Sequence, residues 1–250
     1  MTRRYLSTSD ISKAVGVHPN TVRLYEQWGF LPPVSRSPSG YRQFTERHLD
    51  QMRLARLALH GGWPGRNIRQ SALALVRQSA LGDLGGALER AYRHLALVQA
   101  ERAQAEVAAE LVERWAQGAA TDVITEPLYI NQAAELLGVT ADILRNWERN
   151  GLIKTPRAKN GYRLYGAAEI GRLRVIRTLL RAGYSSMAIL RMLRRFDLGQ
   201  RTGLRQVLDA PTLQDILYAT DRWLSTLAEQ EQRAAGMIAQ LEKMIRKRRP

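Results

Sequence analysis

The stretch Gly16-Val17-His18-Pro19-Asn20-Thr21-Val22-Arg23-Leu24-Tyr25-Glu26-Gln27-Trp28-Gly29 decides the fold of this chain. Gly16 is placed to end a preceding short helix, because a tight turn favours a residue that tolerates positive φ. We expect Ser9 or Asp10 to cap that preceding helix. Pro19 suits the first turn of a second helix that runs to residue 27. Two short helices joined by a turn with glycine predict a helix-turn-helix.

A small hairpin is expected next. Residues 32–40 are rich in proline and serine, and they lead into Gly40-Tyr41-Arg42. Turn residues between short extended segments are typical of a hairpin, here a wing with a basic tip that carries Arg42. Helical patterns follow at about 46–60 and again after a turn at Gly62-Trp63.

The whole pattern occurs twice. Gly138-Val139-Thr140-Ala141-Asp142-Ile143-Leu144-Arg145-Asn146-Trp147-Glu148-Arg149-Asn150-Gly151 repeats the first stretch 122 positions later. The wing then recurs as Gly161-Tyr162-Arg163, at an offset of 121, so one residue has been deleted in a loop. A helix at 167–181, a turn at Gly183-Tyr184 and another helix complete the second copy. The chain therefore contains two copies of one unit.

The excess of basic residues is concentrated in the two repeated units. The 250 residues include 38 Lys+Arg and 23 Asp+Glu, a net charge of +15. Residues 1–78 carry +8 and residues 127–196 carry +9, whereas residues 79–126 between them carry −4. Two basic blocks predict contact with a polyanion at two places, because basic surfaces bind phosphates with release of counterions.

These motifs resemble the MerR family of bacterial transcription regulators. The resemblance is carried in both copies by Gly-Val, then Arg-x-aromatic-Glu and Gly, and then by Gly-Tyr-Arg, over about 1–76 and 127–195. It implies a mainly α fold of two winged helix-turn-helix domains, each followed by a long coiled-coil-type helix. It also implies that the recognition helix and the wing contact double-stranded DNA. The expected DNA-binding residues are Asn20, Thr21, Arg23, Leu24, Tyr25, Tyr41 and Arg42 in the first copy, and Thr140, Asp142, Arg145, Asn146, Trp147, Tyr162 and Arg163 in the second.

The roles of several of these residues stay open at this point. Arg23 fits either a guanine edge or a phosphate. For Tyr25, Trp147 and the wing tyrosines, packing inside a small domain competes evenly with a phosphate contact. Glu26 and Glu148 are expected to form intradomain ion pairs or caps. Because the two recognition helices differ in sequence, we expect an imperfect palindrome, or one copy that binds mainly through the DNA backbone.

Two further segments have the spacing of coiled-coil helices, with apolar residues at alternating steps of four and three. They span about 84–117 and 212–247 and are interrupted by Arg102 and Glu231. We expect them to pair within the chain and form a pseudo-dimer; pairing between two chains is the alternative. The expected domains are residues 1–78 and 127–196 for the DNA-binding units, with 79–126 and 197–250 as linker and dimerisation-type helices, the latter with a basic tail.

The resemblance also implies an effector, whose existence and identity the sequence leaves open. The absence of cysteine rules out thiolate metal sites and iron–sulfur clusters within these residues. Ordinary core packing is the favoured role of the aromatic residues of the long helices and hinges, with an effector pocket as the alternative. The pocket candidates are Trp63, Tyr92, Trp115, Tyr184, Tyr218 and Trp223. The four histidines are expected at the surface or in turns.

The sequence favours a regulator that reads two half-sites and distorts promoter DNA, with RNA polymerase as a further partner at a promoter. The alternative is an architectural, nucleoid or recombination accessory protein that bends DNA. A weaker third reading is a protein that sequesters small molecules. No catalytic constellation is present, and we expect no enzyme activity, cofactor or metal. Without an apolar run of about 20 residues or a leader, the expected location is the bacterial cytoplasm, in association with the nucleoid.

Overall fold

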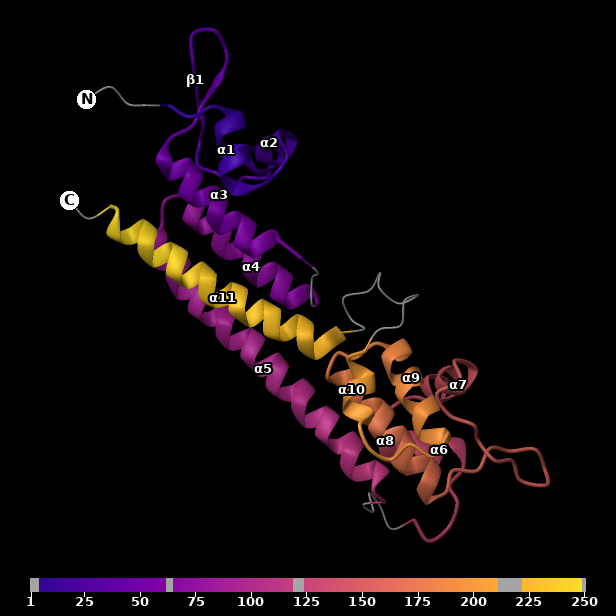
Figure 1. Cartoon of the computed structure of the whole chain (residues 1–250). Coiled ribbons are helices and arrows are strands. Elements are labelled where there is room, and N and C mark those ends of the chain that lie inside the picture. Colours follow the sequence, from indigo (N-terminus) through magenta and orange to yellow (C-terminus); the bar gives the residue numbers. More distant parts are fainter. Residues whose placement is uncertain (1–4, 62–64, 119–123, 211–221, 249–250) are drawn as a thin grey trace. The chain divides into compact units, whose positions relative to one another are not determined.

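The computed structural model describes residues 5–61, 65–118, 124–210 and 222–248. Within those ranges the chain is mainly helical, as expected, with one short two-stranded sheet (Figure 1). Its elements in chain order are α1 (Thr8–Val15), α2 (Pro19–Gln27), β1 (Ser35–Arg36), β2 (Arg42–Gln43), α3 (Glu46–Leu59), α4 (Arg66–Ala80), α5 (Leu84–Ala116), α6 (Ile130–Leu137), α7 (Ala141–Arg149), α8 (Ala167–Arg181), α9 (Ser186–Asp197), α10 (Leu204–Leu208) and α11 (Trp223–Arg246).

The chain forms two compact units. Unit 1 comprises residues 1–100 and 227–250, and unit 2 comprises residues 101–226. Each unit contains one helix-turn-helix with its wing, which we call head 1 (α1 to α4) and head 2 (α6 to α9). The first part of α5 and most of α11 belong to unit 1, and the rest of α5 belongs to unit 2.

Local sequence signals fix where α1 begins and where α1 and α6 end. Ser7, rather than Ser9 or Asp10, is the N-cap of α1. Its hydroxyl accepts from the Asp10 backbone N–H at 3.2 Å, and the Asp10 carboxylate accepts from the Ser7 N–H at 2.8 Å. This reciprocal capping box satisfies two amide groups, which is why the helix begins at Thr8. Gly16 and Gly138 end α1 and α6 in the left-handed conformation, at φ 67° and 58°.

In each head, the two arms of the wing pair with each other, and the second arm also pairs with the segment before the first helix. In head 1, β1 and β2 pair antiparallel with Arg36 opposite Arg42, and Leu6 bridges to Phe44. In head 2 the corresponding bridges join Arg157 to Arg163 and Leu128 to Tyr165. The residues at the base, Phe44 and Tyr165, are almost completely buried. The wing is therefore anchored in the core of its head by the segment that precedes the first helix.

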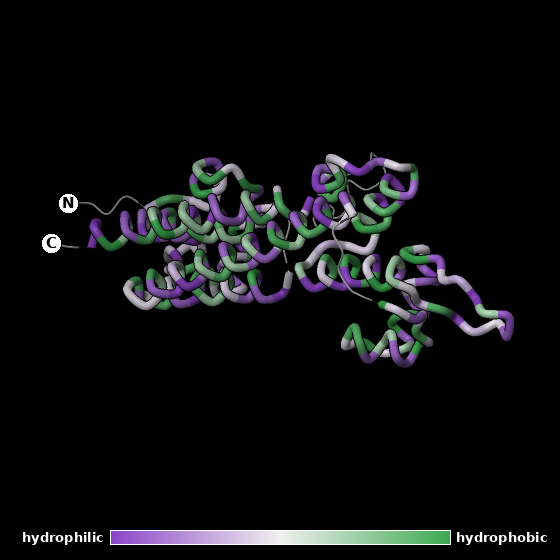
Figure 2. Tube along the Cα trace, turned by 90° about the horizontal axis from the view of Figure 1, so that it is seen from below, coloured by the Kyte–Doolittle hydropathy of each residue, from purple (hydrophilic) through white to green (hydrophobic). Residues whose placement is uncertain are grey.

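In unit 1 the first part of α5 lies antiparallel to α11 (Figure 1). The Tyr92 hydroxyl donates to Glu242 at 3.3 Å, and the Gln99 amide donates to Glu231 at 2.9 Å, so residue numbers rise on one helix as they fall on the other. Figure 2 shows that hydrophobic and hydrophilic residues are interspersed along the helices of the chain. The buried faces of α5 and α11 include the apolar residues Ala87, Ala91, Val98, Ala234, Met237 and Leu241 and the polar residues His94 and Gln230.

Each head packs against the long helix of the other repeat. Head 1 contacts α11, where Lys247 Nζ is 2.6 Å from an Asp50 carboxylate oxygen and the Gln240 amide donates to the Asp50 carbonyl at 2.9 Å. Head 2 contacts the second part of α5, where the Tyr184 hydroxyl donates to the Ala105 carbonyl at 3.1 Å. The Arg205 backbone N–H also donates to the Glu113 carboxylate at 2.9 Å. Each head also contacts the long helix of its own repeat, because Ala87 and Ala91 of α5 lie in the core of head 1 and Trp223 of α11 bonds the Ala182 carbonyl in head 2.

Candidate nucleic-acid interface

The second helix of each helix-turn-helix has one buried and one exposed face. In α2, Val22 and Tyr25 face the core, while Asn20, Arg23 and Leu24 are exposed and Thr21 is half-buried. In α7 the buried residues are Leu144 and Trp147, and the exposed ones are Asp142, Arg145 and Asn146. The polar residues singled out from the sequence therefore share the outer face of each helix.

An arginine on each outer face is held by a residue one turn earlier. The Arg23 guanidinium donates to the Asn20 side-chain oxygen at 3.0 Å. Arg145 forms the equivalent contact with the Asp142 carboxylate at 2.5 Å, which in head 2 is an ion pair. Both arginines are thus oriented toward the N-terminal end of their helix, the part that enters the major groove in helix-turn-helix proteins.

Thr140 and His18 are the N-cap residues of the two recognition helices. The Thr140 hydroxyl accepts from the Ile143 backbone N–H at 3.3 Å as the N-cap of α7. In head 1 the same place is taken by His18, whose Nδ1 accepts from the Asn20 N–H at 3.2 Å. Thr140 is exposed, so the capping hydroxyl lies at the surface beside Asp142.

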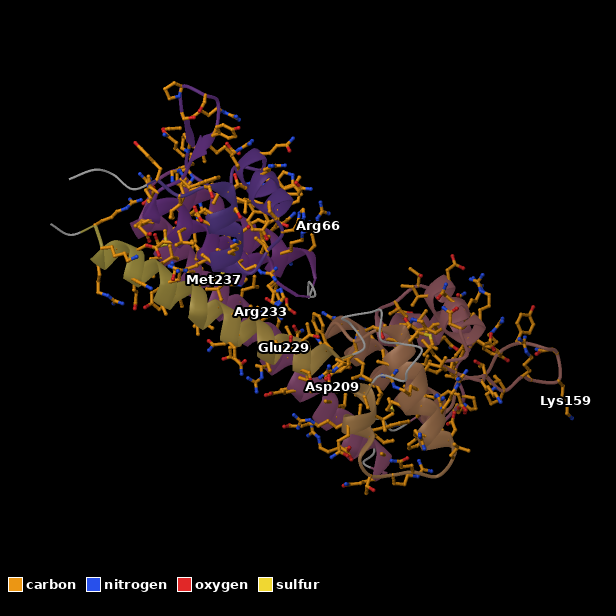
Figure 3. The ribbon with its side chains drawn as sticks, turned by 45° about the horizontal axis from the view of Figure 1, so that its top comes forward. Arg66, Lys159, Asp209, Glu229, Arg233 and Met237 are labelled. Atoms are coloured by element: carbon orange, nitrogen blue, oxygen red, sulfur yellow. The ribbon has the colours of Figure 1, made fainter. Side chains whose placement is uncertain are left out.

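The wings present exposed tyrosines and basic residues. Tyr41 is 76% exposed and Tyr162 is 65% exposed. Arg36 donates to the Gly40 carbonyl at 3.2 Å, and Arg157 donates to the Gly161 carbonyl at 3.1 Å, so an arginine closes the turn of each wing. Lys159 stands at the tip of the second wing (Figure 3).

Arg42 and Arg163 are not on the wing tips, where the sequence placed them. Arg42 lies on β2, and its Nε donates to the Glu26 carboxylate at 2.5 Å; Arg163 bonds Glu148 in the same way at 2.6 Å. The side chains of these pairs are only 20–27% exposed. The intradomain ion pairs expected for Glu26 and Glu148 are confirmed. Each pair fastens the wing to the recognition helix, because its partners come from β2 and α2 or their counterparts in head 2.

Tyr25 and Trp147 lie in the cores of their heads, with 5% and 8% of their surface exposed. The Tyr25 ring stacks on Trp28 at 6.2 Å and meets Phe30 edge-on at 5.7 Å. Burial raises the pKa of the Tyr25 hydroxyl, although Arg56 nearby opposes the rise. Both rings are therefore packed inside their heads.

The expected effector-pocket residues do not converge on one cavity within the described ranges. Tyr92 is half exposed in unit 1 and bonded to Glu242. Tyr184 and Trp223 are buried, and the Trp223 indole N–H donates to the Ala182 carbonyl at 2.7 Å. Burial also raises the pKa of Tyr184. Trp63 and Tyr218 lie outside the described residues.

Trp115 borders a cavity in unit 2. Its ring stacks on Phe196 at 4.0 Å, and Arg201 lies over the Phe196 ring at 3.9 Å. A cavity of about 390 Å³ beside them is also lined by Arg172 and Asp197, which form an ion pair at 2.5 Å. Its walls come entirely from unit 2.

Two histidines are buried, contrary to the expectation of surface or turn positions. His48 Nδ1 accepts from the Thr45 backbone N–H at 3.0 Å, and its Nε2 lies 3.2 Å from the Pro33 carbonyl. His94 has no exposed surface, and neither of its ring nitrogens has a hydrogen-bond partner among the described residues. Both residues lie on the inward faces of their helices. The sequence led us to expect them at the surface because histidine is polar.

Sequence reasoning also missed three wing residues, Arg36, Arg157 and Lys159. Arg36 and Arg157 occupy the same place in the two repeats, at an offset of 121. That recurrence was the available signal, because it puts a basic residue at the same wing position in both copies. Across the described ranges, no helix is long and apolar enough to cross a membrane. Nor does any group of three or more acidic or histidine side chains there form a candidate metal site.

Together, the paired short helices, the wings and the exposed basic faces define a protein with two winged helix-turn-helix heads. The family model described as MerR HTH family regulatory protein matches residues 6–74 and 128–195, which together make up more than half of the chain. The chain therefore belongs to the MerR family.

Curated relatives match parts of the chain. The HTH-type transcriptional regulator CueR of Escherichia coli O6:H1 is 36% identical over 58 residues, which are 23% of this chain and 43% of the relative. A probable heavy metal-dependent transcriptional regulator of Haemophilus influenzae is 31% identical over 119 residues, 47% of this chain and 80% of the relative. The chain thus spans less than half the length of the CueR relative. No solved structure gives a significant match.

Proposed function

We propose that this protein is a sequence-specific DNA-binding transcription regulator that reads two half-sites with its two heads and distorts promoter DNA. The observation that carries the proposal is the match of the family model to two separate regions, each with a recognition helix and an ion-paired wing. The relatives' printed descriptions as transcriptional regulators support the same function. Double-stranded DNA is the proposed partner, and RNA polymerase is a further proposed partner at a promoter.

The proposed interface follows from the exposed residues. In head 1 it comprises Asn20, Thr21, Arg23, Leu24 and Tyr41; in head 2 it comprises Thr140, Asp142, Arg145, Asn146 and Tyr162. We add Arg36, Arg157 and Lys159 from the wings. Arg42 and Arg163 act mainly by holding the wings, because their guanidinium groups are engaged by glutamates. Tyr25 and Trp147 act by supporting the recognition helices from within.

The proposed domains are residues 1–78 and 127–196 for DNA binding, with 79–126 and 197–250 as linking and dimerisation-type helices. The contacts of each head with parts of both long helices support a pseudo-dimer made by one chain. A dimeric regulator needs two heads to address two half-sites, and this chain carries both. The distortion of promoter DNA is proposed from the resemblance to the MerR family.

The name of the Haemophilus relative mentions heavy metals, but these 250 residues contain no cysteine from which to build a thiolate site. We therefore propose no soft-metal effector. The cavity beside Trp115 is large enough for a small organic molecule, and its lining combines an aromatic ring with an ion pair.

The proposal is tested by selecting duplexes from a random-sequence pool and measuring competition against unselected DNA at several salt concentrations. A regulator should prefer its selected site by about 10³-fold or more. A preference below about 10-fold, with a steep salt dependence, would instead favour the architectural alternative. Arg23→Ala and Arg145→Ala are matched variants, each expected to cost about 1–3 kcal/mol in one half-site only.

A further inference from the structure

The two recognition helices differ at one position that bears directly on DNA recognition. Asn20 in α2 corresponds to Asp142 in α7, at the repeat offset of 122. Both side chains are exposed, and both contact the arginine one turn later. Head 1 therefore pairs its arginine with a neutral amide, whereas head 2 pairs it with a carboxylate.

This difference changes the charge at the tip of the helix. The first turn of α2 contains no acidic residue, while the first turn of α7 contains Asp142. The N-terminus of a helix carries a partial positive charge that attracts phosphate. In head 1 the exposed side chain at this position is the neutral Asn20, whereas in head 2 it is the Asp142 carboxylate, which is 88% exposed.

The same difference changes what the arginine can do. Arg145 is bound to Asp142 at 2.5 Å by a charge-assisted hydrogen bond, so part of its charge is neutralised before DNA arrives. Arg23 is bound to the Asn20 oxygen at 3.0 Å by a neutral acceptor and keeps its full charge. Head 2 consequently has less net attraction for the DNA backbone at this position than head 1.

The base preference should differ as well. An asparagine amide both donates and accepts, which matches the N6 and N7 edge of adenine. A carboxylate only accepts, and in the major groove it matches the N4 amino group of cytosine. A carboxylate also disfavours the acceptor-rich edge of guanine, since no donor is available to pair with it.

We infer that Asp142 is a specificity-determining residue that makes the second half-site different from the first, with cytosine facing Asp142 where adenine faces Asn20, and that it weakens head 2 relative to head 1. This inference rests on the proposed function. It predicts an operator that is asymmetric at a defined position and gives the protein one fixed orientation on DNA.

The test is random-sequence selection with the wild type, Asp142→Asn and Asn20→Asp, followed by affinity measurements on the selected duplexes. Asp142→Asn should replace cytosine by adenine in the second half-site and make the site more symmetric. It should also raise affinity about ten-fold and steepen the slope of log K against log salt by about one. Asn20→Asp should do the reverse in the first half-site.

Glu110→Gln is the control for charge, because it changes the net charge by the same amount on an exposed position of α5, outside both heads. It should leave the selected sequence unchanged. If the wild type selects an asymmetric site and Asp142→Asn still selects the same second half-site, the inference is overturned while the proposed function stands. If the wild type enriches no sequence at all, the proposed function falls, and the inference falls with it.

Discussion

His94 gives a quantitative test of the packing of α5 in unit 1. The side chain has no exposed surface, and neither ring nitrogen has a partner among the described residues. Burial lowers the pKa of His94 to about 4, compared with about 6.5 for an exposed histidine. The folded protein therefore holds the neutral imidazole, whereas the unfolded chain takes up a proton more readily.

The sign and size of the effect follow from this difference. Because the pKa is lower in the folded state, the contribution of His94 to stability is fully present above about pH 6.5 and is lost as the pH falls toward 4. A ten-fold change in proton affinity is worth about 1.4 kcal/mol, so the full loss is roughly 3 kcal/mol. Between pH 7.5 and 4.5 the expected loss is about 2.5 kcal/mol.

Hydrogen exchange of peptides covering residues 84–100, corrected for intrinsic rates, measures the opening free energy of this segment at each pH. The comparison variants are His94→Leu and His94→Gln, neither of which titrates in this range. Both should lack the component of about 2.5 kcal/mol, while the contributions of carboxylates cancel in the difference from the wild type. His94→Leu should also be more stable than the wild type by about 1 kcal/mol at pH 7.5, because it removes a buried polar group without partners.

The reasoning would be refuted by a wild type and a His94→Leu variant with the same dependence of opening free energy on pH. That result would mean that the His94 ring is hydrated or bonded in solution. His94→Gln is the control for changes in packing, since it keeps a polar side chain of similar size but does not titrate in this pH range. A variant that loses stability at pH 7.5 but keeps the pH dependence would likewise contradict the account.

Two other contacts give further predictions. Glu26→Gln should release Arg42 and lower affinity for the selected DNA several-fold in one half-site. The stability should change by less than about 1 kcal/mol, because the ion pair is partly solvated. Competition binding on half-site variants checks this, and an equal loss of affinity at both half-sites would contradict it. Trp223→Phe should lower the free energy of unfolding of unit 2 by about 2 kcal/mol, because the Ala182 carbonyl loses its buried donor. An unchanged midpoint of urea unfolding for that unit would argue against the contact.

Features set by local physical rules were predictable from the sequence. The left-handed glycines at the turns, the proline at the start of α2 and the repeat itself follow from conformational preferences that neighbouring residues impose. The wings were found because the Gly-Tyr-Arg motif recurs. The mainly α class and the membership of the MerR family followed from these same local signals.

Features that depend on distant contacts were not predictable in the same way. The capping box at Ser7 was missed because Ser9 and Asp10 compete for the same role, and only the backbone geometry decides among them. Arg42 was placed on the wing tip because the sequence does not show that Glu26, sixteen residues earlier, lies within 2.5 Å. The packing of Lys247 against Asp50 joins residues 197 positions apart, which no local pattern reveals.

The most direct test of the central claim is the mass of the protein on its selected duplex, measured by light scattering at moderate salt. If the two heads of one chain read one operator, the complex contains a single 28.3 kDa chain on an imperfect inverted repeat. Two chains on one such site would contradict the account, because each chain would then supply only one working head.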